Sequence, residues 1–186
     1  MEKVNNIRIL ALSGSLRRKS YNTALIKAVA QLAPSDIEVV VFDEMGLLPL
    51  FNPDREGEDI EAVIKLQNEL NKSDGLIISS PEYAHGISSV LKNALDWLVS
   101  GEEFPYIPVA LYNTSPRATH AQAALREVVS TMSANIIESA CVSVPLLGTN
   151  LDATGIVNNK EISQLMLSKI SLFGDEILKC RSKNKI

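Results

Sequence analysis

Cysteine is scarce in this sequence, and long apolar runs are absent. The chain has two cysteines among 186 residues, Cys141 and Cys180, and their separation matches no metal-binding spacing. Both are expected to be reduced, mostly structural thiols, which indicates a cytoplasmic protein. No apolar stretch is long enough to span a bilayer, and the start Met1–Asn6 lacks the charged-then-apolar layout of a secretory signal. We expect neither export nor a membrane partner.

Positive charge is also limited. The formal net charge is −4, and basic residues cluster only at Arg17-Arg18-Lys19. A nucleic-acid-binding surface needs a broad positive footprint, so no nucleic-acid partner is expected. With 46% hydrophobic and 22% charged residues the composition is that of a globular protein, and the length predicts a single domain over 1–186.

Several motifs of nucleotide-binding and hydrolytic enzymes are missing. There is no Gly-x-x-x-x-Gly-Lys-Ser/Thr, and no Gly-x-Gly-x-x-Gly follows the first apolar run. This argues against a P-loop ATPase and against a dinucleotide-binding Rossmann domain. Neither of the two histidines accompanies a nucleophile motif such as Gly-x-Ser-x-Gly, so a hydrolase is disfavoured.

Short apolar runs alternate with amphipathic stretches along the chain. The predicted strands are 7–12, 37–42, 75–79, 107–112 and 136–144, and the predicted helices are 25–32, 60–70, 88–98, 118–132 and 162–178. Parallel neighbours need crossover connections, so this alternation predicts an α/β fold with three layers, a doubly wound five-stranded parallel sheet. Of the two common strand orders of such sheets, we expect 2-1-3-4-5. Ligands of such sheets bind beyond the carboxyl ends of the strands, where the strand order reverses between strands one and three.

The loop after the first strand is dense in hydroxyl groups and positive charge. It runs from Ser13 to Asn22 and enters the first helix, whose free N–H groups and positive dipole end attract anions. Ser15, Ser20 and Asn22 offer polar side chains, and Arg17 offers a charge-assisted contact. We predict a phosphate site here. The alternative is that Ser20 or Asn22 only caps the helix and the cations are solvated.

The loop after the third strand has the features of a wall for a planar ring. Pro81 supplies a stiff bend, Tyr83 an aromatic plane, and Gly86 a close approach of the main chain. Trp97, in the following helix, is predicted to pack in the core or at a subunit contact.

Three motifs together carry a resemblance to a known family. Gly-Ser-Leu-Arg-x-x-Ser-x-Asn follows strand one, and Pro-Glu-Tyr-x-x-Gly and Leu-Lys-Asn-Ala-Leu-Asp-Trp follow strand three. This arrangement resembles the NADPH-dependent FMN reductase family, the chromate, quinone and azo reductases of the flavodoxin-like fold. The resemblance implies an FMN phosphate at the first loop, an isoalloxazine ring at the second, chiefly against backbone, and a ribityl or phosphate contact after strand four. The implied residues are Ser15, Arg17, Ser20 and Asn22, then Pro81, Glu82, Tyr83 and Ala84, and finally Ser115.

The sequence departs from the family pattern in places. Ala84 stands where the family commonly has Asn, so a side-chain contact is lost while a backbone N–H remains. Ser88-Ser89 replaces Pro-Gly, and the segment 116–120 is shorter than the family's Gly-Gly-containing stretch. Two roles stay open: His85 either contacts the nucleotide or acceptor or is simply exposed, and Arg117 either meets nucleotide phosphates or is solvated.

The resemblance implies a two-step reaction, in which hydride passes from NADPH or NADH to bound FMN and then to a quinone, chromate, azo compound or free flavin. The alternatives are a non-enzymatic FMN-binding electron carrier and a flavin-dependent sensor. The resemblance also implies a homodimer or homotetramer, for which the helix 88–98 and its neighbouring loops are the expected interface.

Overall fold

Apolar runs of five to seven residues form one parallel sheet. In the computed structural model, which describes residues 6–183, the strands are β1 (Ile7–Ser13), β2 (Ile37–Phe42), β3 (Gly75–Ser79) and β6 (Pro108–Asn113), followed by the short strands β7 (Asn135–Ile136) and β8 (Val142–Ser143). The order is β2-β1-β3-β6-β7, and β8 also pairs with β6. Every pairing in this sheet is parallel, which confirms the predicted order. The stretch Met1–Asn6 was predicted not to be a secretory signal, and residues 1–5 of it lie outside the described residues.

The fifth strand differs from its prediction. The continuous strand expected over 136–144 is broken into β7 and β8 by a 3₁₀ turn, η2 (Glu138–Ala140). At this break the backbone N–H of Leu111 in β6 donates to Sγ of Cys141 at 3.3 Å. A thiol therefore takes the place of a backbone carbonyl, and the ladder with β6 is interrupted there.

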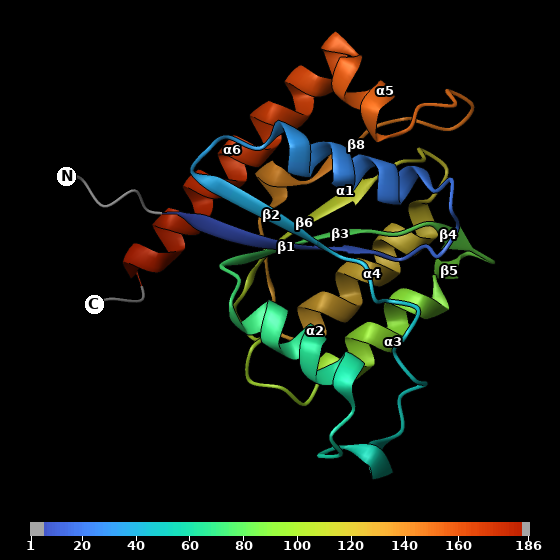
Figure 1. The fold of residues 1–186 in the computed structure, drawn as a ribbon, viewed down its shortest axis with the longest axis vertical. Coiled ribbons are helices and arrows are strands. Elements are labelled where there is room, and N and C mark those ends of the chain that lie inside the picture. Colours follow the sequence, from blue (N-terminus) through green and yellow to red (C-terminus); the bar gives the residue numbers. More distant parts are fainter. Residues whose placement is uncertain (1–5, 184–186) are drawn as a thin grey trace.

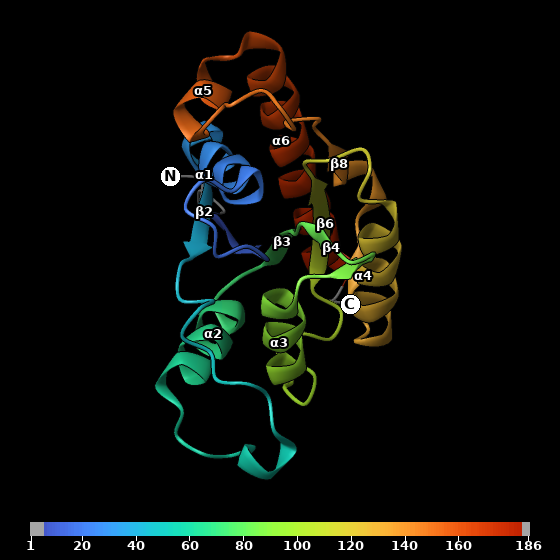
Figure 2. The ribbon, with the colours of Figure 1, turned by 90° about the vertical axis from the view of Figure 1, so that its right-hand side faces the viewer.

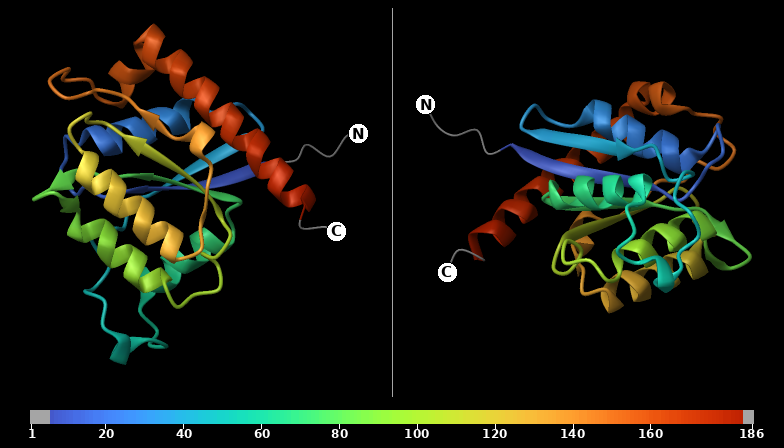
Figure 3. Two further views of the ribbon diagram at one scale, coloured as in Figure 1. Left: turned by 180° about the vertical axis from the view of Figure 1, so that it is seen from behind. Right: turned by 60° about the horizontal axis from the view of Figure 1, so that its bottom comes forward.

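Helices cover both faces of the sheet (Figures 1 and 2). One face packs against α1 (Tyr21–Leu32), α5 (Ala153–Asn158) and α6 (Lys160–Lys183). The other face packs against α2 (Glu61–Asn71), α3 (Ser89–Leu98) and α4 (Thr119–Thr131), and Figure 3 shows α3 and α4 side by side. Each face has its own apolar core because the central strands carry buried residues on both sides, as expected for a covered parallel sheet.

Some elements were not predicted, and others differ in length. The predicted loop after β3 contains a hairpin of two short strands, β4 (Glu82–Tyr83) and β5 (Gly86–Ile87). A short helix, α5, precedes α6, and α6 begins earlier and ends later than the predicted 162–178. None of the helices within residues 6–183 is long and apolar enough to cross a membrane. Both cysteines are free.

A long arm, residues 43–60, connects β2 to α2 and projects from the body of the molecule (Figure 1). It contains a 3₁₀ turn, η1 (Pro53–Arg55). Two side chains of α3 hold its base. Asn93 accepts a hydrogen bond from Phe51 N and donates one to Pro49 O, and Trp97 Nε1 donates to the same Pro49 oxygen at 2.8 Å. Trp97 is buried and stacks edge-on against Phe51, so its predicted packing role is confirmed.

Candidate functional site

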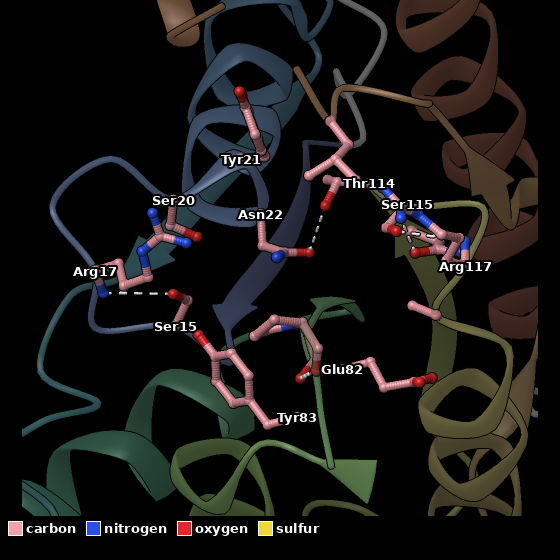
Figure 4. Close-up of a pocket in the computed structure, with 15 residues that line it drawn as sticks. Ser15, Arg17, Ser20, Tyr21, Asn22, Glu82, Tyr83, Thr114, Ser115 and Arg117 are labelled. Atoms are coloured by element: carbon pink, nitrogen blue, oxygen red, sulfur yellow. Dashed lines mark hydrogen bonds between the residues drawn. The ribbon is translucent and has the colours of Figure 1, made fainter. Parts of the chain in front are cut away.

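The loops at the carboxyl ends of β1, β3 and β6 enclose a cavity of about 370 Å³ (Figure 4). The parallel register brings these ends together: Ser13 lies beside Ser79, and Ser79 lies beside Tyr112. The cavity is therefore at the edge of the sheet where the strand order reverses, as the sequence predicts.

Most residues predicted to bind a cofactor line this one cavity, although they come from three separate loops. Those that line it are Ser15, Arg17, Ser20, Asn22, Pro81, Glu82, Tyr83 and Ser115. The ninth, Ala84, is not among the lining residues. Other residues also line the cavity, and of these only Arg117 had been considered for a ligand: Tyr21, Ser80, Asn113, Thr114, Arg117, Ala118 and Leu147. Asn113 and Thr114 were detectable in principle, because they are the first two residues after the predicted strand 107–112.

The first loop combines a helix cap with an unpaired cation. Ser20 is the N-cap of α1, and its Oγ accepts from Thr23 N at 3.3 Å. Helix capping by Ser20 was the alternative to a phosphate site in the sequence analysis. Ser20 also lines the cavity, so capping does not remove it from the site. Arg17 is exposed and forms no ion pair with any described residue. A free guanidinium beside a helix N-terminus is an arrangement that attracts an anion.

Gly14 lies where the first loop packs against the second. A Cβ at this position would lie 2.4 Å from Ser80 Oγ and 2.7 Å from Ser88 Oγ. The backbone N–H of Gly14 donates to Ser79 O at 2.9 Å. Gly14 therefore allows the first two loops to pack directly against each other.

Asn22 ties the three loops together from a buried position. Its Oδ1 accepts from Ser79 Oγ at 2.9 Å and from Thr114 Oγ1 at 3.2 Å. Each partner lies at or just beyond the end of a different strand, so one amide fixes the spacing of β3 and β6 relative to α1. Because both bonds use the carbonyl oxygen, the Asn22 amide nitrogen is left to donate into the cavity.

The second loop is a tight hairpin. Ala84 and His85 join β4 to β5 with positive φ values of 48° and 59°, which is the pattern of a two-residue type I′ turn. The turn explains why Ala84 lies away from the cavity. Tyr83, just before the turn, is half exposed, and in Figure 4 its ring points toward the side of the cavity that Ser15 occupies.

Glu82 links this hairpin to the start of α4. Its Oε2 accepts from the backbone N–H of Ala121 at 2.8 Å, and α4 has no side-chain cap of its own. Its Oε1 lies 3.2 Å from Nδ1 of His85, and the His85 ring lies 4.5 Å from that of His120. The Ala121 hydrogen bond, together with the nearby His120 and His85, holds the pKa of Glu82 below its usual range. A carboxylate is thus kept beside the cavity.

The third loop is ordered by its own side chains. Asn113 Oδ1 accepts from Ser115 N at 3.0 Å, and Ser115 Oγ accepts from Arg117 N at 3.3 Å. Arg117 lines the cavity, whereas His85 does not and is bound to Glu82 instead. Of the two residues whose roles the sequence left open, Arg117 therefore lies at the cavity, whereas His85 is exposed and lies against Glu82.

Comparison with known proteins agrees with this geometry. The family described as NADPH-dependent FMN reductase matches residues 7–147, which include all three loops of the cavity. The chain belongs to this family. The match ends near Leu147, the last residue that lines the cavity.

Individual proteins resemble the chain to different extents. An NAD(P)H-dependent FMN reductase from Pseudomonas aeruginosa is 29% identical over 178 residues, covering 91% of this chain and 96% of the relative. A 2-hydroxy-1,4-benzoquinone reductase from Burkholderia sp. is 42% identical over 91 residues, which span 49% of each protein. The chain therefore matches about half the length of that relative.

A solved structure supports the fold. FerB, a flavoenzyme NAD(P)H:(acceptor) oxidoreductase from Paracoccus denitrificans, superposes with a TM-score of 0.82 at 26% identity, covering 93% of this chain and 98% of that one.

Proposed function

We propose that the protein is an FMN-dependent oxidoreductase that takes hydride from NADPH or NADH and passes it to a small acceptor such as a quinone. The observation that supports this most directly is the single cavity that gathers the residues implied by the family motifs from three separate loops. Members of the same family carry the names of FMN and quinone reductases.

The residues of the cavity fit FMN. The N-terminus of α1, the guanidinium of Arg17 and the hydroxyl of Ser15 suit a phosphate group. Pro81 and Tyr83 suit a planar ring, and the volume of about 370 Å³ lies within the usual range of cofactor pockets. When bound, FMN supplies the chemistry of accepting and donating a hydride.

The chain's own residues bind and orient the ligand. Asn22 holds the loops in register, and the amide that faces the cavity is free to donate. The half-exposed Tyr83 leaves one side of the cavity open, where a nucleotide and an acceptor can take turns. This reaction requires no protein nucleophile, in keeping with the absence of a nucleophile motif.

The direct test is reconstitution followed by turnover. Flavin-free protein titrated with FMN should quench flavin fluorescence at a defined stoichiometry, and the loaded protein should oxidise NADPH or NADH when a quinone is present. Arg17→Ala should weaken FMN binding by about 10- to 100-fold, the effect of one charge-assisted hydrogen bond. Arg55→Ala, which removes an exposed cation from the projecting arm, is the control and should leave FMN affinity unchanged.

Other results would contradict the proposal. Protein that takes up no FMN would exclude a flavoenzyme. Protein that binds FMN but is reduced by NADPH and NADH only very slowly in stopped-flow mixing would be an electron carrier, and bound FMN that is reduced but turns over no acceptor would indicate a sensor.

The remaining aspects of the proposal concern the whole protein. It is proposed to be one domain over 1–186, acting in the cytoplasm as a homodimer or homotetramer. The projecting arm supports the oligomer, because it is fixed to α3 and yet presents Leu47 and Leu50 to solvent at 67% and 83% exposure. Exposed leucines on an ordered arm are typical of a surface that another subunit covers.

A further inference from the structure

Two cavities at the carboxyl edge of the sheet share a wall. The first is the cavity described above, and the second, of about 690 Å³, lies between the first turns of α1 and residues 150–154. Arg17, Ser20 and Tyr21 line both cavities, so the first loop forms the ridge between them. The walls of the second cavity are joined where Asn150 N donates to the Tyr21 hydroxyl at 3.2 Å. The side chains around the two openings therefore form one continuous surface.

Five exposed cations surround these openings. They are Arg17, Arg18, Lys19, Lys27 and Arg117, here called the basic rim. Figure 4 shows Arg17 and Arg117 on opposite sides of the first cavity. None of the five forms an ion pair with any described residue. Three of them are adjacent in the sequence, and folding brings the other two to the same surface.

The carboxylates at this surface do not neutralise the basic rim. Within residues 6–183, Glu82 and Asp152 are the two carboxylates that line the cavities. Each already accepts from a backbone N–H at 2.8 Å, Glu82 from Ala121 and Asp152 from Gly155. A positive surface therefore surrounds the openings, although the net charge of the chain is −4.

Exposed apolar side chains stand among these cations. Leu16 directly precedes Arg17 and is 60% exposed, and Leu147, which lines the first cavity together with Arg17 and Arg117, is 51% exposed. Leu16 is supported from below, because a Cβ on Gly46 would lie 3.3 Å from its Cδ2. Peripheral membrane binding combines these two features, since cations attract anionic headgroups and apolar side chains enter the boundary of the acyl chains.

The position of this surface favours a lipid bilayer over other anionic partners. An acidic protein would also attract the basic rim. The leucines, however, flank the opening of the cavity in which we place the reaction, and quinones with apolar tails dissolve in the bilayer rather than in water. A bilayer would supply both the negative charge and the acceptor.

We propose that the basic rim, with Leu16 and Leu147, docks the protein reversibly on an anionic lipid surface, so that its acceptor is a quinone with an apolar tail held in the bilayer. Such a quinone takes up one hydride, which comes from the nicotinamide nucleotide, and one proton from water, and it leaves as the hydroquinone. The identity of the acceptor rests on the proposed function, whereas the docking does not. The sequence predicted no membrane partner because it lacks a spanning segment and a secretory signal, and peripheral docking requires neither.

Sedimentation with lipid vesicles tests the docking without turnover. Flavin-free and FMN-loaded protein should both sediment with vesicles of phosphatidylcholine and phosphatidylglycerol in equal parts, and not with phosphatidylcholine alone. An ionic strength of about 1 M, where the Debye length is about 3 Å, should release most of the protein. Absence from the anionic vesicles, or equal binding to both kinds, would overturn the proposal. Protein that binds soluble polyglutamate but no vesicles would also overturn it, and would indicate an acidic protein partner.

A charge variant locates the surface. Arg17 also belongs to the proposed phosphate site, so the variant is R18S/K19S. It should weaken vesicle binding by about 10- to 30-fold, the effect of two basic residues near an anionic surface. The matched control K72S/K179S changes the net charge equally at the amino end of β3, where Lys72 precedes the strand and Lys179 follows Ile177, which packs at Gly75. The control should bind vesicles like the wild type, and equal losses in both variants would overturn the proposal.

An apolar variant tests contact with the acyl boundary. Leu16→Ser should weaken vesicle binding by about 3- to 10-fold, as expected when half of a leucine side chain is buried. Val99 is 55% exposed at the C-terminal end of α3, and α3 runs away from the cavity. Val99→Ser should therefore leave vesicle binding unchanged. Unchanged binding of Leu16→Ser would show that this side chain does not enter the lipid and would overturn its part in the docking surface.

Kinetics tests the acceptor. With a quinone that carries a long isoprenoid tail and is embedded in the anionic vesicles, kcat/KM should be about 10-fold lower for R18S/K19S than for wild type. With a short water-soluble quinone the two proteins should have equal kcat/KM. Equal losses with both quinones would overturn the acceptor assignment and leave the oxidoreductase function intact. If neither quinone is reduced, the proposed function fails, and sedimentation still decides whether the protein docks on the lipid surface.

Discussion

At the scale of single residues, Glu82 shows how a residue of the family motif can line the cavity and also hold two loops together through its side chain. The family resemblance implies that Glu82 lines the flavin ring chiefly through its backbone. Its carboxylate instead accepts from Ala121 N and lies against His85. The sequence could not reveal the hydrogen bond to Ala121, because Glu82 and Ala121 are 39 residues apart and meet only in the folded chain. The side chain thus fixes the angle between the hairpin and α4.

The charge of Glu82 gives a pH-dependent prediction. Its pKa is held below the usual range by the Ala121 hydrogen bond, so its ionised form stabilises the folded state. That contribution is present above the carboxyl's unfolded pKa, about 4.3, and is lost as pH falls through the lower folded value. Flavin-free Glu82→Gln should therefore have a lower Tm than wild type at pH 7, and the difference should shrink toward pH 3.

A matched variant isolates the position of the charge. Glu127→Gln neutralises an exposed carboxylate in α4, the helix whose first turn Glu82 contacts, but nearer the C-terminal end of that helix. It should leave Tm nearly unchanged at both pH values, because a negative charge is not favourable at that end of the helix dipole. Thermal unfolding monitored by circular dichroism measures the Tm of both variants at each pH. Equal Tm losses at pH 7 and pH 3 for Glu82→Gln would show that its charge contributes nothing.

At the scale of elements, long apolar segments were predictable and short ones were not. Strands such as β1 and β3 are buried on both faces, so their sequences are continuous apolar runs that periodicity detects. The β4–β5 hairpin has two residues per strand and Ala-His at its turn, where the common signal is Asn-Gly. At the break in the fifth strand the Cys141 thiol accepts a hydrogen bond from Leu111 N, and in the sequence this cysteine looks like one more apolar residue of the strand.

The strained turn gives a prediction about stability. Ala84 adopts a left-handed conformation that costs an alanine about 1 kcal/mol and that asparagine tolerates better. Ala84→Asn should therefore stabilise the protein by about 0.5–1 kcal/mol, an increase in Tm of about 1–4 °C for a chain of this size. Urea denaturation with an unchanged m-value would measure it.

The same substitution on a helix is the control. Ala123 is exposed within α4, where asparagine is a poorer helix former than alanine. Ala123→Asn should destabilise by about 0.6 kcal/mol, opposite in sign to the change at the turn. A loss of stability at both positions would mean that the turn conformation is not strained.

At the scale of the whole molecule, the strand order predicts where the cavity lies, and the long connections determine its surroundings. Five apolar runs and the crossover rule predict a doubly wound parallel sheet, and the order of its strands places the three motif loops at one edge. Part of the arm, 46–53, was predictable as irregular chain from Pro49 and Pro53. Its attachment to α3 through Asn93 and Trp97 was not, because side-chain contacts between distant segments leave no periodic signal.

This attachment leads to a prediction about assembly. The arm presents Leu47 and Leu50 on a base that α3 holds in place, so little ordering entropy opposes their burial against a second subunit. The wild type should be a dimer or tetramer at micromolar concentration in light scattering. The L47D/L50D variant would bury unpaired carboxylates at this contact, so it should be mostly monomeric.

Leu165 and Leu167 provide the control, since both are exposed on α6, which covers the opposite face of the sheet. L165D/L167D makes the same two substitutions and the same change in charge, and it should leave the oligomer intact. If this variant dissociates and L47D/L50D does not, the interface lies on α6 and the arm faces solvent. A wild type that is monomeric at these concentrations would contradict the assembly itself, while the cavity, which a single chain completes, would still be expected to bind FMN.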